Sequence, residues 1–95
     1  MEIKFIFKHL ESSEGIKGYA EEKSERLKKY FNHKLNVQWF FSVEKTDQIA
    51  EVKVDGDSFH CVSEAKADSL YASIDLAIDK VVVQAKKHKE IITQH

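Results

Sequence analysis

Proline is absent from this 95-residue chain, and glycine and cysteine are scarce, at three residues and one. Without proline or a glycine-rich stretch, no segment has the composition of a linker, and no internal repeat or low-complexity region is present. The single cysteine, Cys61, excludes an internal disulfide, and its place in an alternating apolar segment favours a structural thiol over a reactive one. We therefore expect one domain over residues 1–95.

Long hydrophobic runs are also missing. The longest runs, such as Trp39-Phe40-Phe41 and Val81-Val82-Val83, fall far short of the ~20 residues that cross a bilayer. The N-terminus alternates charged with apolar residues, whereas a secretory signal joins a basic patch to an apolar run. The sequence predicts a cytoplasmic protein without a membrane association.

Charge is nearly balanced over the whole chain, at a formal −1, but it is unevenly distributed. Residues 17–34 and residues 80–95 each carry +3, whereas residues 1–16 carry −1 and residues 35–79 carry −6. Two basic segments therefore flank an acidic middle. Local basic patches of this kind attract phosphate groups.

Hydrophobic periodicity predicts an α+β fold with the order β-α-β-β-β-α. Alternating apolar residues predict strands over residues 2–8, 37–44, 50–55 and 59–64, with turns at 45–48 and 55–57. Apolar residues at three-and-four spacing predict two helices, one capped by Ser13 and ending near residue 32, the other capped at Asp68-Ser69 and ending near residue 90. Because each helix has one apolar stripe, we expect a four-stranded sheet with both helices packed on one face.

Catalytic and metal-binding patterns are not apparent. The five histidines fall on different elements or termini, and there is no CxxC, HExxH, nucleophile elbow or glycine-rich phosphate loop. Asp75 and Asp79 are four residues apart on one helix and could form a carboxylate pair. Asp79 also lies beside lysines on the next turn, so a solvated or salt-bridged face is the simpler interpretation. His88 ends the apolar stripe of the second helix, which indicates a half-buried imidazole. We expect no enzyme activity, metal or cofactor.

The lysines and arginine of the two helices are candidates for contacts with phosphate. If the helices lie side by side, the outward sides that carry Lys23, Arg26, Lys29, Lys80 and Lys87 can merge into one strip along a phosphate backbone. Such a strip supplies salt-dependent affinity without base readout. Trp39 falls in the inward register and is expected in the core. Phe40 is the aromatic residue placed outside, where it could stack on a base, pack on a sheet edge or mediate self-association.

The second helix closely resembles that of the short bacterial ribosome hibernation-promoting factors, a family that includes the ribosome-associated inhibitor of translation. The residues that carry this resemblance are Tyr71-Ala72-Ser73-Ile74-Asp75, Ile78-Asp79-Lys80, Gln84, Lys87-His88-Lys89 and Gln94-His95, with Ser13, Ile16, Lys23, Arg26-Leu27 and Tyr30-Phe31 in the first helix. The resemblance extends over the whole chain and includes the predicted order of elements.

The resemblance implies a translation inhibitor that binds the small ribosomal subunit and its ribosomal RNA, in the channel for messenger RNA and transfer RNA, in stationary phase. Five residues match basic positions of the family and are expected to contact RNA: Lys23, Arg26, Lys80, Lys87 and Lys89. Local chemistry alone adds Lys28, Lys29 and Lys86 to this set. Val83 stands before Gln84 where the family usually has arginine, which removes one expected contact with RNA, and Lys86 could replace it.

The chain stops at residue 95, so we expect the short form of the family, which promotes pairing of inactive ribosomes together with ribosome modulation factor. It is expected to be a monomer away from the ribosome. Two alternatives remain open from the residues alone. One is a protein-interaction module whose acidic sheet side contacts a basic partner. The other is a binder of double-stranded RNA with a similar topology.

Overall fold

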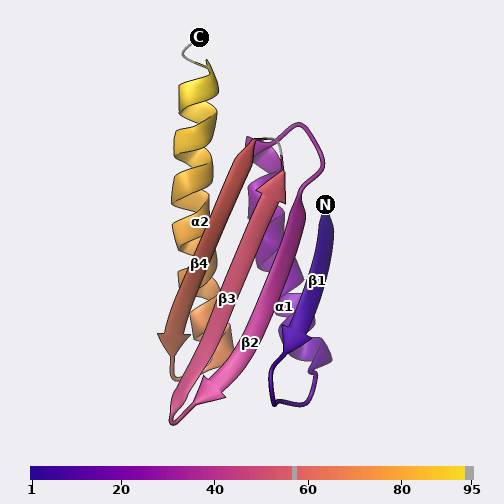
Figure 1. Cartoon of the computed structure of the whole chain (residues 1–95), viewed down its shortest axis with the longest axis vertical. Helices are drawn as coiled ribbons and strands as arrows, with labels where there is room; N and C mark the ends of the chain where they lie inside the picture. The colour runs from indigo at the N-terminus through magenta and orange to yellow at the C-terminus, as the bar shows by residue number, and fades with distance from the viewer. Residues whose placement is uncertain (57, 94–95) are drawn as a thin grey trace.

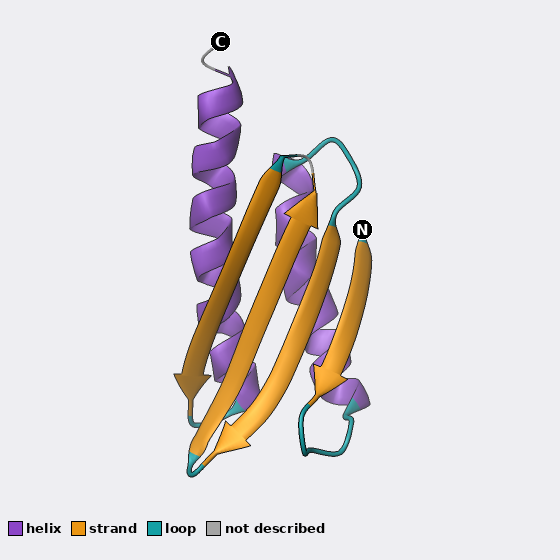
Figure 2. Cartoon of the chain, viewed as in Figure 1, coloured by secondary structure: helices purple, strands orange, loops and turns teal. Residues whose placement is uncertain are grey.

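The computed structural model describes residues 1–56 and 58–93. Its elements follow the predicted order: β1 (Glu2–Phe7), α1 (Glu14–Ser24), the 3₁₀ helix η1 (Glu25–Tyr30), β2 (Asn36–Glu44), β3 (Asp47–Gly56), β4 (Phe59–Ala67) and α2 (Leu70–Thr93). The strands lie in the order β1-β2-β3-β4, with β1 parallel to β2 and the other neighbours antiparallel. Both helices cover the same face of the sheet (Figures 1 and 2), which confirms the predicted α+β fold.

The core lies between that face and the two helices. Strand β2 alternates from Asn36 to Ser42, so that Val37, Trp39 and Phe41 are buried while the residues between them are at least partly exposed. The predicted inward register of Trp39 is therefore confirmed. Leu27 of η1 and Ile74 and Ile78 of α2 close the core from the helix side, all of them fully buried.

The first helix differs from its predicted form. A continuous α-helix to about residue 32 was expected, but α1 ends at Ser24 and the chain continues as a 3₁₀ helix to Tyr30. The cause lies at Ser24, whose buried hydroxyl donates to the carbonyl of Ala20 at 2.7 Å and accepts from the indole N–H of Trp39 at 2.9 Å. A serine that bonds to the carbonyl four residues back tends to bend a helix.

The other boundaries shift by a few residues. Strand β3 begins at Asp47 rather than at residue 50, because the turn after β2 needs only Lys45 and Thr46, with Lys45 in the left-handed region at φ 58°. Helix α2 begins at Leu70, capped by the Ser69 hydroxyl, and extends to Thr93 rather than residue 90. Asp57 of the predicted second turn, and Gln94 and His95 of the C-terminal motif, lie outside the described residues.

Gly56, in the turn between β3 and β4, has no substitute in this conformation. Its φ is 138°, and a Cβ atom there would lie 2.6 Å from the carbonyl oxygen of Lys34. The end of β3 is thus packed directly against the segment that leads into β2.

Candidate nucleic-acid interface

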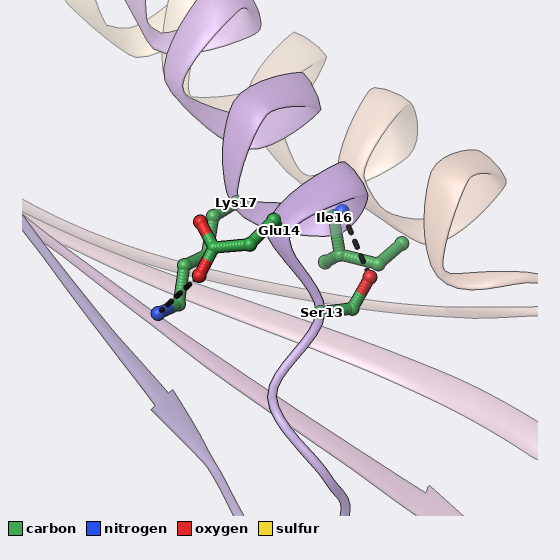
Figure 3. Close-up of polar contacts among 4 residues, drawn as sticks. All are labelled: Ser13, Glu14, Ile16 and Lys17. Carbon is green, nitrogen blue, oxygen red and sulfur yellow. Dashed lines mark hydrogen bonds and ion pairs between the residues drawn. The ribbon is translucent and has the colours of Figure 1, made fainter.

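Helix α1 starts at the cap predicted from the sequence. The Ser13 hydroxyl accepts a hydrogen bond from the Ile16 backbone N–H at 3.2 Å, and Glu14 in the first turn pairs with Lys17 at 3.5 Å (Figure 3). A carboxylate in the first turn also complements the positive end of the helix dipole. The cap sets where α1 begins, and so it sets which of its side chains face α2.

The first helical segment, which consists of α1 and η1, meets α2 along a seam that is held by two acidic side chains of α2. Asp75 accepts a 2.7 Å hydrogen bond from the Tyr19 hydroxyl, and Asp79 forms a 2.7 Å ion pair with Arg26. The Tyr19 and Tyr71 rings also meet edge to face, with centroids 5.0 Å apart. The hydrogen bond to Asp75 is the main cause of a raised pKa at Tyr19, with smaller contributions from desolvation and nearby acids. Asp79 is thus salt-bridged, as predicted for this face, but its partner is Arg26 of η1 and not a lysine of the next turn, and Asp75 accepts from a neutral hydroxyl.

The cations of the first helical segment line this seam and its end. The Lys23 ammonium lies 5.2 Å from the centroid of the Tyr19 ring, and the Lys29 ammonium lies 5.2 Å from that of Tyr30. Lys28 pairs with Glu25 on the preceding turn at 2.6 Å. All three side chains therefore have aromatic or acidic neighbours that fix their positions near η1.

The cations of α2 occupy two different sides of that helix. Lys80 donates to the backbone carbonyl of Glu64 on β4 at 2.9 Å, whereas its neighbour Asp79 faces Arg26. Lys87 follows Lys80 by seven residues, which is about two turns, so it lies on the same side of α2. By the same spacing, Lys86 follows Asp79 and lies on the side facing the first helical segment.

The sequence predicts one strip in which Lys80 and Lys87 join the cations of the first helix. In the structure the contacts divide this strip, because Lys80 bonds to β4 whereas Lys29 lies against the last turns of α2. Lys89 donates to the Lys29 backbone carbonyl at 2.9 Å, which ties the end of η1 to the last turns of α2. We call the lysines carried by these two ends the basic end: Lys28, Lys29, Lys86, Lys87 and Lys89. His88 contacts Phe59, the first residue of β4, so the basic end lies level with this end of the sheet, and Figure 1 shows the final turns of α2 extending past it.

The histidine of the Lys87-His88-Lys89 motif has a packing role. Its ring contacts Phe31 and Phe59, with centroid distances of 5.8 and 5.3 Å, and its Nε2 atom is buried. This confirms the half-buried imidazole expected from the sequence. Because His88 points into the core, the two lysines beside it are directed toward solvent.

The open face of the sheet carries the predicted outward aromatic, Phe40. Its ring is partly exposed and has two ammonium groups near it, Lys8 at 5.2 Å and Lys53 at 5.0 Å from the centroid.

Cys61 on β4 is half-buried, and burial raises the pKa of its thiol. Among residues 1–56 and 58–93, no three histidine, cysteine or acidic side chains converge as metal ligands would. No helix of this described part has the length and apolarity to span a bilayer.

Comparison with known proteins gives one consistent result. Residues 3–93 match the family model described as sigma 54 modulation protein / S30EA ribosomal protein. The chain belongs to this family. The family includes the ribosome hibernation promoting factor of Pseudomonas putida, to which the chain is 33% identical over 90 residues, covering 95% of this chain and 88% of that protein. The corresponding Escherichia coli factor is 29% identical, with both chains covered completely.

Solved structures agree with this assignment. The N-terminal domain of Thermus thermophilus Protein Y superposes with a TM-score of 0.87 at 32% identity, covering 93% of this chain and 99% of that one. A Coxiella burnetii protein at 22% identity shares the fold, with a TM-score of 0.81, covering 95% of this chain and 99% of that one. The family acts in ribosome hibernation, ribosome binding and translation regulation, and it is not enzymatic.

Proposed function

We propose that this protein binds the small ribosomal subunit in the channel for messenger RNA and transfer RNA, inhibits translation there, and promotes pairing of inactive ribosomes in stationary phase. The proposal is supported by the family match over residues 3–93. It is also supported by the basic end, where η1 and α2 present their lysines together. In this proposal the protein is cytoplasmic, is a monomer away from the ribosome, and pairs ribosomes together with ribosome modulation factor.

Electrostatics support a docking orientation. The C-terminal end of a helix carries unpaired carbonyl groups and a negative partial charge, which nearby lysines offset. Lys89 satisfies one such carbonyl, on Lys29, while Lys86 and Lys87 are exposed on α2. The −6 segment, residues 35–79, lies mainly in the sheet and its turns. RNA phosphates are therefore attracted to the helix side and repelled from much of the opposite side.

The eight candidate contacts are not equivalent. Within the part of the chain that the structure describes, Lys86 and Lys87 form no ion pair that a phosphate would have to break, whereas Arg26 and Lys28 must exchange a carboxylate for the phosphate. Lys80 is bonded to a backbone carbonyl of β4. We propose that the basic end makes the main contacts, with Lys23 and Arg26 extending them along the seam and Lys80 contributing from the β4 side.

The test is co-sedimentation with intact ribosomes and separated subunits at several salt concentrations. Phosphate-dominated binding falls with salt by roughly 0.7–0.9 log units per log unit of salt for each contact. The double variant Lys86→Gln, Lys87→Gln should bind the small subunit more weakly, with a slope reduced by about 1.5. Its matched control is Lys45→Gln, Lys66→Gln, which removes the same charge from exposed positions on the sheet side.

Equal weakening of both double variants would show that only net charge matters and would contradict docking through the basic end. Equal binding of wild-type protein to free duplex RNA and to the small subunit would favour the alternative of a double-stranded RNA binder. No binding to ribosomes at low salt, with the protein shown to be folded, would favour the alternative of a protein-interaction module.

A further inference from the structure

The pair between Arg26 and Asp79 places an acidic side chain on one of the cations proposed to contact RNA. The two residues are 53 positions apart in sequence, and the pair joins η1 to α2 through a 2.7 Å contact between Nη1 and Oδ1. Both side chains are open to solvent, at 44% and 60% exposure. A phosphate group approaching the seam can therefore reach the same guanidinium.

We infer that Asp79 is an internal competitor for RNA phosphate at Arg26 and so sets the affinity of the interface; this inference rests on the proposed function. Carboxylate and phosphate oxygens use the same charge-assisted hydrogen bonds to a guanidinium. While Asp79 is paired with Nη1 of Arg26, a phosphate must displace the Asp79 carboxylate or accept hydrogen bonds from the remaining N–H groups of the guanidinium only. The negative charge of Asp79 also repels phosphate from this part of the seam.

The competitor is weak enough to be displaced. Solvent-exposed ion pairs of this kind change an equilibrium by a factor of about two to five at most, because water and salt screen them. RNA that is already held by the basic end can overcome a factor of this size. RNA that reaches Arg26 without contacting the basic end cannot overcome this factor. The ion pair therefore favours ligands that bind the basic end and the seam at the same time.

Asp75 offers a natural comparison on the same helix. It carries the same charge one turn earlier and also reaches the first helix, but its partner is the neutral hydroxyl of Tyr19. Removing the charge of Asp75 changes the general field at the seam without freeing a cation. Any effect specific to Asp79 must therefore come through Arg26.

A double-mutant cycle on binding to small subunits tests the inference. We expect Asp79→Asn to tighten binding about two- to fivefold and to steepen the salt dependence by up to 0.9, the value for one added phosphate contact. In the Arg26→Gln background the same change should have little effect. Asp75→Asn should not reproduce the gain in slope, and circular dichroism should confirm that each variant is folded, with Asp79→Ser as a second replacement.

Other results would overturn the inference. Equal gains from Asp79→Asn with and without Arg26 would reduce the role of Asp79 to general repulsion. Weaker binding by Asp79→Asn would mean that Asp79 orients Arg26 for RNA rather than competing for it. If the wild-type protein fails to bind small subunits, the proposed function fails and this inference with it, an outcome distinct from normal binding without coupling.

Discussion

Replacing Ser24 with alanine should destabilise the fold by more than the loss of one hydroxyl suggests. Ser24 and Trp39 are both fully buried, and the Ser24 hydroxyl oxygen accepts a hydrogen bond from the indole N–H of Trp39 at 2.9 Å. Without that oxygen, the N–H is left buried and unpaired, which costs about 1–3 kcal/mol. The higher helix propensity of alanine returns up to about 0.5 kcal/mol. We expect a net loss of about 2 kcal/mol, or roughly 8–16 °C in Tm for a domain of this size.

Denaturant unfolding followed by far-ultraviolet circular dichroism measures this loss. Trp39 is the only tryptophan of the chain, so its fluorescence also reports whether its own environment changes. Ser12→Ala, at an exposed position just before α1, is the matched control and should leave the free energy of unfolding within about 0.5 kcal/mol of wild type. In a Trp39→Phe background, Ser24→Ala should cost less because no donor is stranded. A loss below about 0.5 kcal/mol, or an equal loss in both backgrounds, would refute the argument.

Three further predictions follow from single positions. Gly56→Ala should destabilise the protein by at least about 1 kcal/mol, because of its positive φ and the nearby carbonyl, whereas Gly18→Ala, with open space around it, should stabilise α1 by up to about 1 kcal/mol in the same unfolding assay. The raised pKa of Tyr19 in the folded state means that its hydroxyl stabilises the fold fully below the ordinary tyrosine pKa of about 10, and that this contribution is lost as pH rises through the folded pKa. A tyrosinate absorbance titration should show a late phase in the wild-type protein that is absent from Tyr19→Phe. Identical titrations of the two proteins at high pH would contradict the prediction. Val83→Arg, at a half-exposed position on α2, should tighten binding to small subunits, and an unchanged or weaker affinity would indicate that Lys86 already compensates.

The sequence was sufficient for features that depend on local pattern. Alternation in β2 placed Trp39 inside and Phe40 outside, and the cap at Ser13 and the half-buried His88 were found from spacing alone. These features report which face of an element is buried, and periodicity contains that information directly.

Features that depend on a distant partner could not be found in this way. The change from α-helix to 3₁₀ helix at Ser24 depends on Trp39, fifteen residues away. The sequence showed that Asp79 lies on an ionic face, but it suggested neighbouring lysines as partners rather than Arg26 of the other helix. Lys80 looked like part of a single basic strip because its bond to a carbonyl of β4 leaves no trace in the spacing.

The parallel pairing of β1 with β2 has a consequence for the order of folding. Strands β2, β3 and β4 are joined by short turns, whereas 28 residues separate the end of β1 from the start of β2. Closing a loop of that length costs about 2 kcal/mol more entropy than closing a two-residue turn. We expect the three-stranded meander to form first and β1 to dock late, after the crossover helix has nucleated. Core truncations in β1 should therefore speed unfolding and leave the refolding rate nearly unchanged.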